Sequence, residues 1–141
     1  FSVAYDGNGG NYGGLTANDF AIIRHNNSAT GVPVMTMSRT NDNTTFAGTV
    51  TGTNFILSSD SRLKENVEEV DNKSINVDWK TFEMKSNKGQ KRYGVIAQEL
   101  EEAHPEFVRT DDEGMKSVAY VDLLIAKIAE LEARLAKVEN K

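Results

Sequence analysis

The sequence predicts an α+β chain in two parts: a β-rich segment over residues 1–58, and a small α+β domain over residues 59–141 that ends in a long helix. Eight of the 11 glycines lie in the first part, which holds only three acids and two bases, for a net charge of −1. The second part holds 18 acids and 14 bases, for −4. Its last residues repeat apolar side chains at helical spacing. This change in composition predicts two domains.

Short strands joined by Gly and Asn turns are expected in the first part. The clusters at 7–11 and 13–14 hold residues that accept positive φ at low cost. Residues 20–24 are a candidate strand, residues 32–38 alternate apolar and small polar side chains, and residues 45–57 carry β-branched residues with glycines between them. So few large aliphatic residues build only a thin core in one chain. We therefore expect an elongated fibre in which several chains intertwine.

Two helices and two hairpins are expected before the final helix. Apolar spacings of three and four residues indicate the helices, and alternating strands around Gly-containing turns indicate the hairpins. Pro105 limits the second helix. The expected elements are a helix at 63–70, a hairpin of 81–85 and 90–93 around a turn at 86–89, a helix at 95–103, and a hairpin of 107–109 and 115–119.

The final helix carries the strongest periodic signal of the chain. Its apolar residues step by 3, 4, 3, 4 and 3 positions: Val121, Leu124, Ile128, Leu131, Leu135 and Val138. This is the heptad spacing of a coiled coil, and branched residues at both core positions favour a trimer over a dimer. We predict that these six residues form a trimer seam. A helix packed on its own domain has a similar period and is the alternative.

Composition excludes several classes of site. Without cysteine there is no disulfide, thiol nucleophile or Cys-based zinc site. His25 and His104 have no carboxylates at ligand spacing, so we expect no metal and no cofactor. No apolar run reaches the length of a membrane span. The mildly acidic balance argues against a nucleic-acid partner.

The boundary between the two parts holds a possible self-cleavage site. A serine hydroxyl needs a base, and with no histidine nearby the candidate base for Ser59 is Lys64. A lysine acts as a base near neutrality only when it is desolvated or lies beside other cations, and Arg62 is a neighbouring cation. In one helix Ser59 and Lys64 would point to different faces, so Ser59 must precede the helix. The hydroxyl could then attack the carbonyl of Ser58.

The same residues also allow a purely structural interpretation, without self-cleavage. Ser59, Asp60 and Ser61 are all good helix N-cap or first-turn residues, so the run could simply start the expected helix. Ser58 is a rival nucleophile, six residues from Lys64.

Several motifs in order resemble one known family. They are Ser59 to Val67 (SDSRLKENV), Tyr93 to Leu100 (YGVIAQEL), Pro105 to Val108 (PEFV), Gly114 to Tyr120 (GMKSVAY) and the closing leucine-rich helix. Residues 59–141 resemble the C-terminal intramolecular chaperone domain of phage tailspikes, tail fibres and neck appendages, a self-cleaving serine peptidase family.

The resemblance implies a homotrimer that assembles an upstream fibre or spike and then severs itself. It places the nucleophile on Ser59, the base on Lys64, supporting roles on Asp60 and Arg62, and the cut between Ser58 and Ser59. The implied partners are two further copies and the upstream fibre chain, and a host receptor for the mature fibre is not named by the sequence. The implied location is the virion tail, with assembly in the host cytoplasm and release of the chaperone part.

Two rival functions remain at this point. One is a trimeric fibre tip whose C-terminal domain only sets the register of three chains, without cleavage. The other is the same domain in a membrane-tethered eukaryotic transcription factor, against which the absence of a basic surface in residues 1–58 argues.

Overall fold

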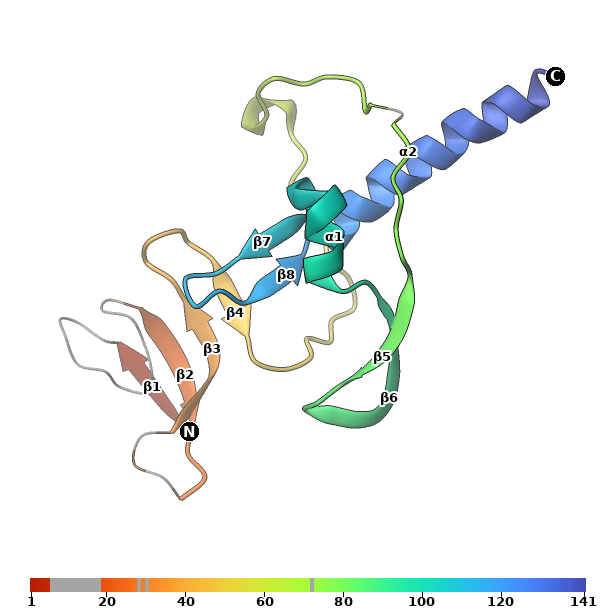
Figure 1. The fold of residues 1–141 in the computed structure, drawn as a ribbon. Helices are drawn as coiled ribbons and strands as arrows, with labels where there is room; N and C mark the ends of the chain where they lie inside the picture. The colour runs from red at the N-terminus through yellow and green to blue at the C-terminus, as the bar shows by residue number, and fades with distance from the viewer. Residues whose placement is uncertain (6–18, 28, 30, 72) are drawn as a thin grey trace. The chain divides into compact units, whose positions relative to one another are not determined.

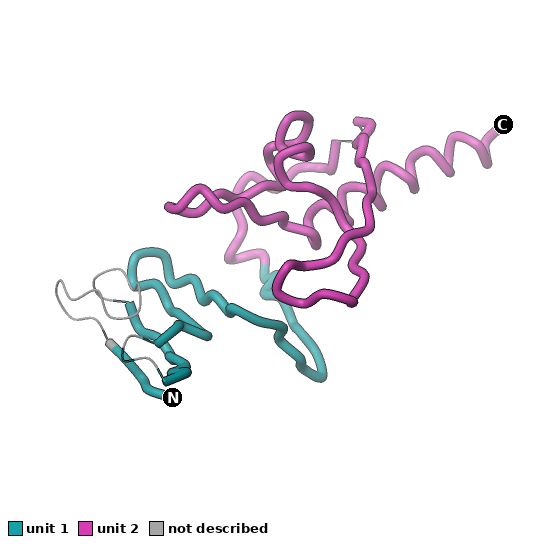
Figure 2. The backbone as a smooth tube through the Cα atoms, turned by 60° about the horizontal axis from the view of Figure 1, so that its bottom comes forward, with its two compact units in different colours: residues 1–60 teal, residues 61–141 magenta. Residues whose placement is uncertain are grey.

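The chain folds into two compact units, Phe1–Asp60 and Ser61–Lys141 (Figure 2). The structure is a computed structural model, and it describes residues 1–5, 19–27, 29, 31–71 and 73–141. The predicted turns at 7–11 and 13–14 therefore lie outside the described residues.

The first unit contains one antiparallel sheet. Its strands lie in chain order and are β1 (Ser2–Tyr5), β2 (Phe20–Arg24), β3 (Val32–Met37) and β4 (Thr44–Phe46) (Figure 1). The strands expected at 20–24 and 32–38 are thus confirmed to within one residue. A β-bulge between Ile22 and Ile23 shifts the pairing of β2 with β3.

The two faces of this sheet are covered unequally. On one face Ala21 and Ile23 are fully buried and form the core of the unit with Ala4 beside them. The other face carries a cross-strand row of apolar side chains. The row runs through all four strands as Val3, Ile22, Met35 and Phe46. Its outer members, Val3 and Phe46, are 68% and 49% exposed. A single chain therefore leaves much of an apolar sheet face in water.

The strand expected over 45–57 is mostly wrong. Pairing stops at Phe46, and residues 47–57 follow without helix or strand. A strand needs a neighbour for its hydrogen bonds, and β-branched residues alone do not supply one. Phe55, Ile56 and Leu57 lie exposed in this segment.

The second unit combines two hairpins with two α-helices. Its elements are a short 3-10 helix (Ser61–Leu63), β5 (Lys80–Met84), β6 (Asn87–Gly94), α1 (Ala97–Ala103), a 3-10 helix (Pro105–Phe107), β7 (Val108–Thr110), β8 (Lys116–Val118) and α2 (Tyr120–Glu139). β5 pairs with β6 and β7 with β8, both antiparallel. The predicted α+β class with a long final helix is confirmed.

Details of the first hairpin and of α1 differ from the expectation. The hairpin turns at residues 85–86 and not at 86–89, because a bulge between Glu83 and Met84 brings Met84 opposite Asn87. Helix α1 starts at Ala97, two residues late, since Ile96 is extended (φ −91°, ψ 120°). Its end follows the prediction: His104, before the proline, leaves the helical region at φ −140° and ψ 64°.

The helix expected at 63–70 is wrong. Only the 3-10 turn Ser61–Leu63 forms, and Asn66 adopts a positive φ of 51°, which no α-helix accommodates. Glu65 and Glu69 would also be like charges four residues apart on a helix, which disfavours it. Residues 64–71 and 73–74 therefore form neither helix nor strand before Ile75, where the chain joins the core.

One core holds the second unit together. It gathers buried residues from the 73–79 segment, the start and middle of α1, the second 3-10 helix, β7 and α2: Ile75, Val95, Leu100, Phe107, Val108 and Leu123. Leu123 is fully buried and is the contribution of α2. The backbone N–H of Ala119 donates to the carbonyl of Phe107 at 2.8 Å, which fixes the entry into the helix.

Tyr120 joins the first hairpin to α2. Its hydroxyl accepts a hydrogen bond from the N–H of Val95 at 3.0 Å. The hydroxyl lies directly over Gly94, where an added Cβ would overlap it, and Phe82 lies 3.3 Å from the same position. Only glycine leaves room for this contact.

We predict that Gly94→Ala lowers the free energy of unfolding by about 1–3 kcal/mol, the usual cost of overpacking. Thermal or urea unfolding measures it. Gly48→Ala is the control, since nothing lies within 4 Å of its added Cβ. Tyr120→Phe removes the hydroxyl, so Gly94→Ala should cost less in that background. Equal costs in both backgrounds would contradict the assigned contact.

Candidate functional site

The predicted cleavage junction is exposed. Every residue from 47 to 71 is exposed, and the only regular structure in this stretch is the turn Ser61–Leu63. In that turn the N–H of Lys64 donates to the carbonyl of Ser61 at 3.1 Å. Each of Ser59, Asp60, Arg62 and Lys64 has an interaction partner in the structure. The expectation that Ser59 precedes a helix is replaced by a shorter turn, and the Ser59–Lys64 dyad stays a prediction.

Helix α2 uses two different faces. Leu123 is fully buried and Glu130 is 3% exposed, and both face the domain that carries the helix, with Ala126 packed beside them. The six predicted seam residues are between 46% and 67% exposed: Val121, Leu124, Ile128, Leu131, Leu135 and Val138. Helix α2 does pack on its own domain, as in the alternative, but it does so with residues other than those of the predicted seam. These six residues form an exposed apolar stripe, and its role as a trimer seam stays a prediction.

A buried ion pair fastens α2 to the chain that leads from the junction. A carboxylate oxygen of Glu130 accepts the ammonium of Lys127 at 2.6 Å and the backbone N–H of Ile75 at 3.2 Å. The same ammonium donates to the carbonyl of Ile75 at 2.8 Å. Arg134 lies 3.4 Å from the other carboxylate oxygen. We call this set of contacts the Glu130 clamp, because it holds both polar backbone groups of one residue.

The electrostatics of the clamp favour the charged carboxylate. The hydrogen bond from Lys127 lowers the pKa of Glu130 below its ordinary value, and burial of the group opposes that shift only in part. The backbone N–H of Ile75 lowers the pKa further. A carboxylate satisfied in this way is tolerated inside the unit.

Sequence reasoning missed the clamp. The heptad pattern of the final helix concerned its apolar positions, and Glu130 entered only as a residue with high helix propensity. The signal that could have found it is the spacing of Leu123, Ala126 and Glu130, which lie three and four residues apart on one side of the helix. Nothing in the sequence tells that the chain around Ile75 would cover that side.

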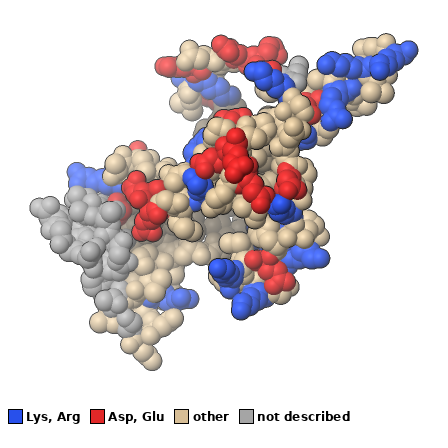
Figure 3. Space-filling view, in the orientation of Figure 1, with Lys and Arg blue, Asp and Glu red and all other residues tan. Residues whose placement is uncertain are grey.

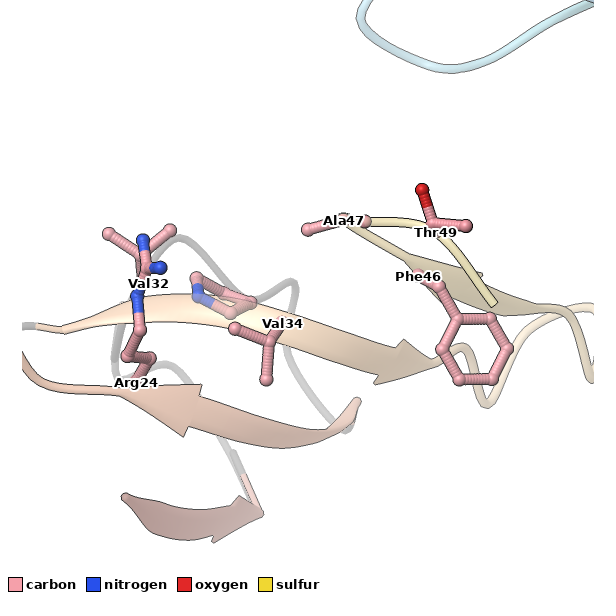
Figure 4. A pocket seen from close by; sticks show the side chains of 8 residues that line it. Arg24, Val32, Val34, Phe46, Ala47 and Thr49 are labelled. Atoms are coloured by element: carbon pink, nitrogen blue, oxygen red, sulfur yellow. The ribbon is translucent and has the colours of Figure 1, made fainter. Parts of the chain in front are cut away.

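The first unit carries a pocket of about 340 Å³ where β4 ends and β3 continues (Figure 4). Arg24 of β2 lies beside Val32 of β3, its cross-strand partner. Val34, Phe46, Ala47 and Thr49 complete most of the lining. Its described lining residues include one cation, Arg24, and one hydroxyl, Thr49, but no side chain that could act as a base for that hydroxyl.

The described residues offer neither a metal-binding cluster nor a membrane-spanning helix. Among residues 1–5, 19–27, 29, 31–71 and 73–141 there is no group of three or more His, Cys, Asp or Glu side chains arranged to hold a metal ion. No helix in the described part of the chain is both long and apolar enough to cross a membrane.

Comparison with known proteins identifies the segment that begins at the junction. Residues 59–109 match the family model of peptidase S74, described as the chaperone of endosialidase. The match starts at Ser59 and runs through the first hairpin and α1 into β7. No curated protein and no solved structure matches the chain.

Residues 59–109 are therefore similar to the chaperone-of-endosialidase family. This confirms the resemblance to the C-terminal intramolecular chaperone of phage tail proteins. The family supports a chaperone role, a serine-peptidase character and a phage tail context for the chain.

The clamp predicts a specific acid sensitivity. A carboxyl whose folded pKa lies below its unfolded value, near 4.3, contributes stability above that unfolded value and loses it as pH falls through the folded pKa. Glu130→Gln removes the titrating group, so the free energy of unfolding should be lower at pH 7 and should fall less between about pH 5 and pH 3. Urea unfolding across this range measures it.

The matched control is Glu132→Gln, an exposed glutamate on the same helix. It should leave both the stability at pH 7 and its pH dependence unchanged. A Glu130→Gln profile parallel to that of the unsubstituted chain would show that the carboxylate does not stabilise the fold.

Proposed function

We propose that the chain is an intramolecular trimerisation chaperone for a phage tail fibre or spike, and that it releases itself by cutting between Ser58 and Ser59. The observation that carries this proposal is the family match that starts at residue 59. The exposure of Ser58 and Ser59 is compatible with it, because the residues on both sides of the bond to be cut are accessible.

The proposed chemistry uses only groups of the chain. The neutral amine of Lys64 takes the proton of the Ser59 hydroxyl, and the oxygen attacks the carbonyl carbon of Ser58. The bond from this carbon to the nitrogen of Ser59 breaks, and the nitrogen takes up a proton to become a free amine. Water then hydrolyses the Ser58 ester and restores the hydroxyl. The attack gains from the enforced proximity of neighbouring residues, and each chain turns over once.

Assembly into three chains is supported by what a single chain leaves uncovered. The stripe of α2 and the apolar row of the first unit are both exposed. The accessible surface is 11691 Å². Two separate compact units of these sizes would expose about 8,700 Å², so about 3,000 Å² per chain is in excess. This is the scale of a permanent oligomer interface.

The proposed order is assembly first and release second. Strands rich in threonine and glycine specify their register weakly, and a slip of one residue turns every side chain to the other face. A helix that trimerises early would align the three chains and raise their effective concentration. Cleavage would then leave the trimeric fibre in the virion tail and free residues 59–141.

A second function uses the same assembly without the cut. In it the chain is a permanent fibre tip and Ser59 only precedes the turn at 61–63. The exposed stripe favours this function as much as the first, and only the fate of the Ser58–Ser59 bond separates them.

The proposed Ser59–Lys64 dyad can be tested by substitution. Ser59→Ala and Lys64→Ala should each leave a full-length, folded, uncut chain, because each removes one partner of the proton transfer. Denaturing gels of purified protein follow the cut. Ser58→Ala is the control and should still be cut. If Ser59→Ala is cut and Ser58→Ala is not, the nucleophile lies one residue earlier.

The proposed trimer seam on α2 can be tested in the same way. Leu131→Asp would place three carboxylates in one apolar layer of a trimer seam, each costing several kcal/mol when buried unpaired. Analytical ultracentrifugation should then show monomers or aggregates. Lys137→Asp, outside the stripe on the same helix, should keep the trimer. A trimer that survives Leu131→Asp would show that the seam lies elsewhere.

A further inference from the structure

An exposed acidic segment follows the junction. We call residues 65–71 the arm. Its side chains Glu65, Glu68 and Glu69 have no ion pair with any residue that the structure describes, while Asp71 pairs with Lys73 at 2.6 Å. Val67 and Val70 are 77% and 48% exposed. A segment with both unpaired carboxylates and exposed valines can bind a surface that offers a cation beside an apolar pocket.

The complementary chemistry lies on the first hairpin. A pocket of about 420 Å³ opens between β5–β6, α1 and the start of α2. We call it the hairpin pocket. Phe82, Met84, Val118 and Tyr120 give it an apolar lining. Arg92, the cross-strand partner of Phe82, is also a lining residue. Over the described residues Arg92 has no ion pair.

The charges around the pocket add to this complementarity. Lys116 also lines it, but its ammonium already binds Glu101 at 2.8 Å. Lys85 and Lys88 stand at the exposed end of the hairpin, next to one acid, Glu83. Figure 3 shows Asp and Glu side chains gathered along the arm and Lys and Arg side chains along the hairpin.

Within the second unit the arm and the hairpin lie apart. Both ribbon views show the arm on the opposite side of the unit from the end of β5–β6 (Figures 1 and 2). The Glu130 clamp holds the chain at Ile75, so the arm extends from α2. From Ile75 to Val67 the chain reaches at most about 29 Å. Packed helices lie about 8–10 Å apart, so in a trimer the arm can reach the neighbouring copy.

We propose that the arm of one chain docks in the hairpin pocket of a second copy. In an extended arm Val67 and Glu69 point to the same side, so Val67 enters the apolar lining while Glu69 meets Arg92. The contact is head to tail, and in a ring of three it closes on itself. It rests on the proposed trimer, and it adds a second interface that locks each chain to its neighbour beside the junction.

The chain contains no cysteine, so one engineered pair reports the contact. Val67→Cys combined with Met84→Cys should form disulfides between chains, and non-reducing gels should show linked dimers and trimers. The matched control is Val67→Cys with Tyr93→Cys. Tyr93 is exposed on the opposite face of the same hairpin, and this pair should link at least tenfold less.

A charge exchange tests the pairing of Glu69 with Arg92. Glu69→Arg and Arg92→Glu should each reduce linking of the Val67–Met84 cysteine pair severalfold, and the two changes together should restore it. Sedimentation of the unsubstituted chain runs beside this test. A trimer with links only within chains, with no links, or without rescue by the exchange overturns the docking and leaves the proposed function intact. A monomer overturns both.

Discussion

The attachment of α2 to its own domain is the constraint on which the rest of the structure depends. One apolar residue, Leu123, and one buried carboxylate, Glu130, fix which side of the helix faces inward. Because a helix rotates as a rigid unit, burying these two residues turns the heptad residues outward. The clamp at the same time fastens the chain at Ile75, 16 residues after Ser59, to that inward side. Anchoring and exposure are two consequences of the same contacts.

Both units of the chain leave large apolar side chains exposed. Among its described residues the first unit has two fully buried hydrophobic side chains and an apolar row on its open face. The second has a core of six residues and a 20-residue helix whose apolar stripe is bare. Association of copies, as in the proposed trimer, would cover both. A cut at the boundary between the units would then separate the part that aligns the chains from the part that remains.

The sequence predicted those elements whose signals are local. The hairpins, α1 and α2 followed from turns, Pro105 and helical spacing, and residues 20–24 and 32–38 from alternation. The helix at 63–70 was wrong because apolar spacing outweighed two local facts, the positive φ that Asn66 tolerates and the repulsion between glutamates. The strand over 45–57 was mostly wrong because a strand also needs a neighbouring strand for its hydrogen bonds, and its own residues do not show whether one is there. The Glu130 clamp was missed for a related reason, since its partner lies 55 residues away. Ser59 and Lys64 were found by their order in the chain and by family resemblance, and their chemistry stays a prediction.

The intact mass of the purified chain, measured under denaturing conditions after incubation, tests the central claim most directly. The account predicts two products whose masses add up to the chain plus one water, the larger beginning with Ser59, Asp60 and Ser61. A single species of 15.5 kDa that persists on incubation, in a protein that sediments as a trimer, would contradict self-cleavage and leave a permanent fibre tip.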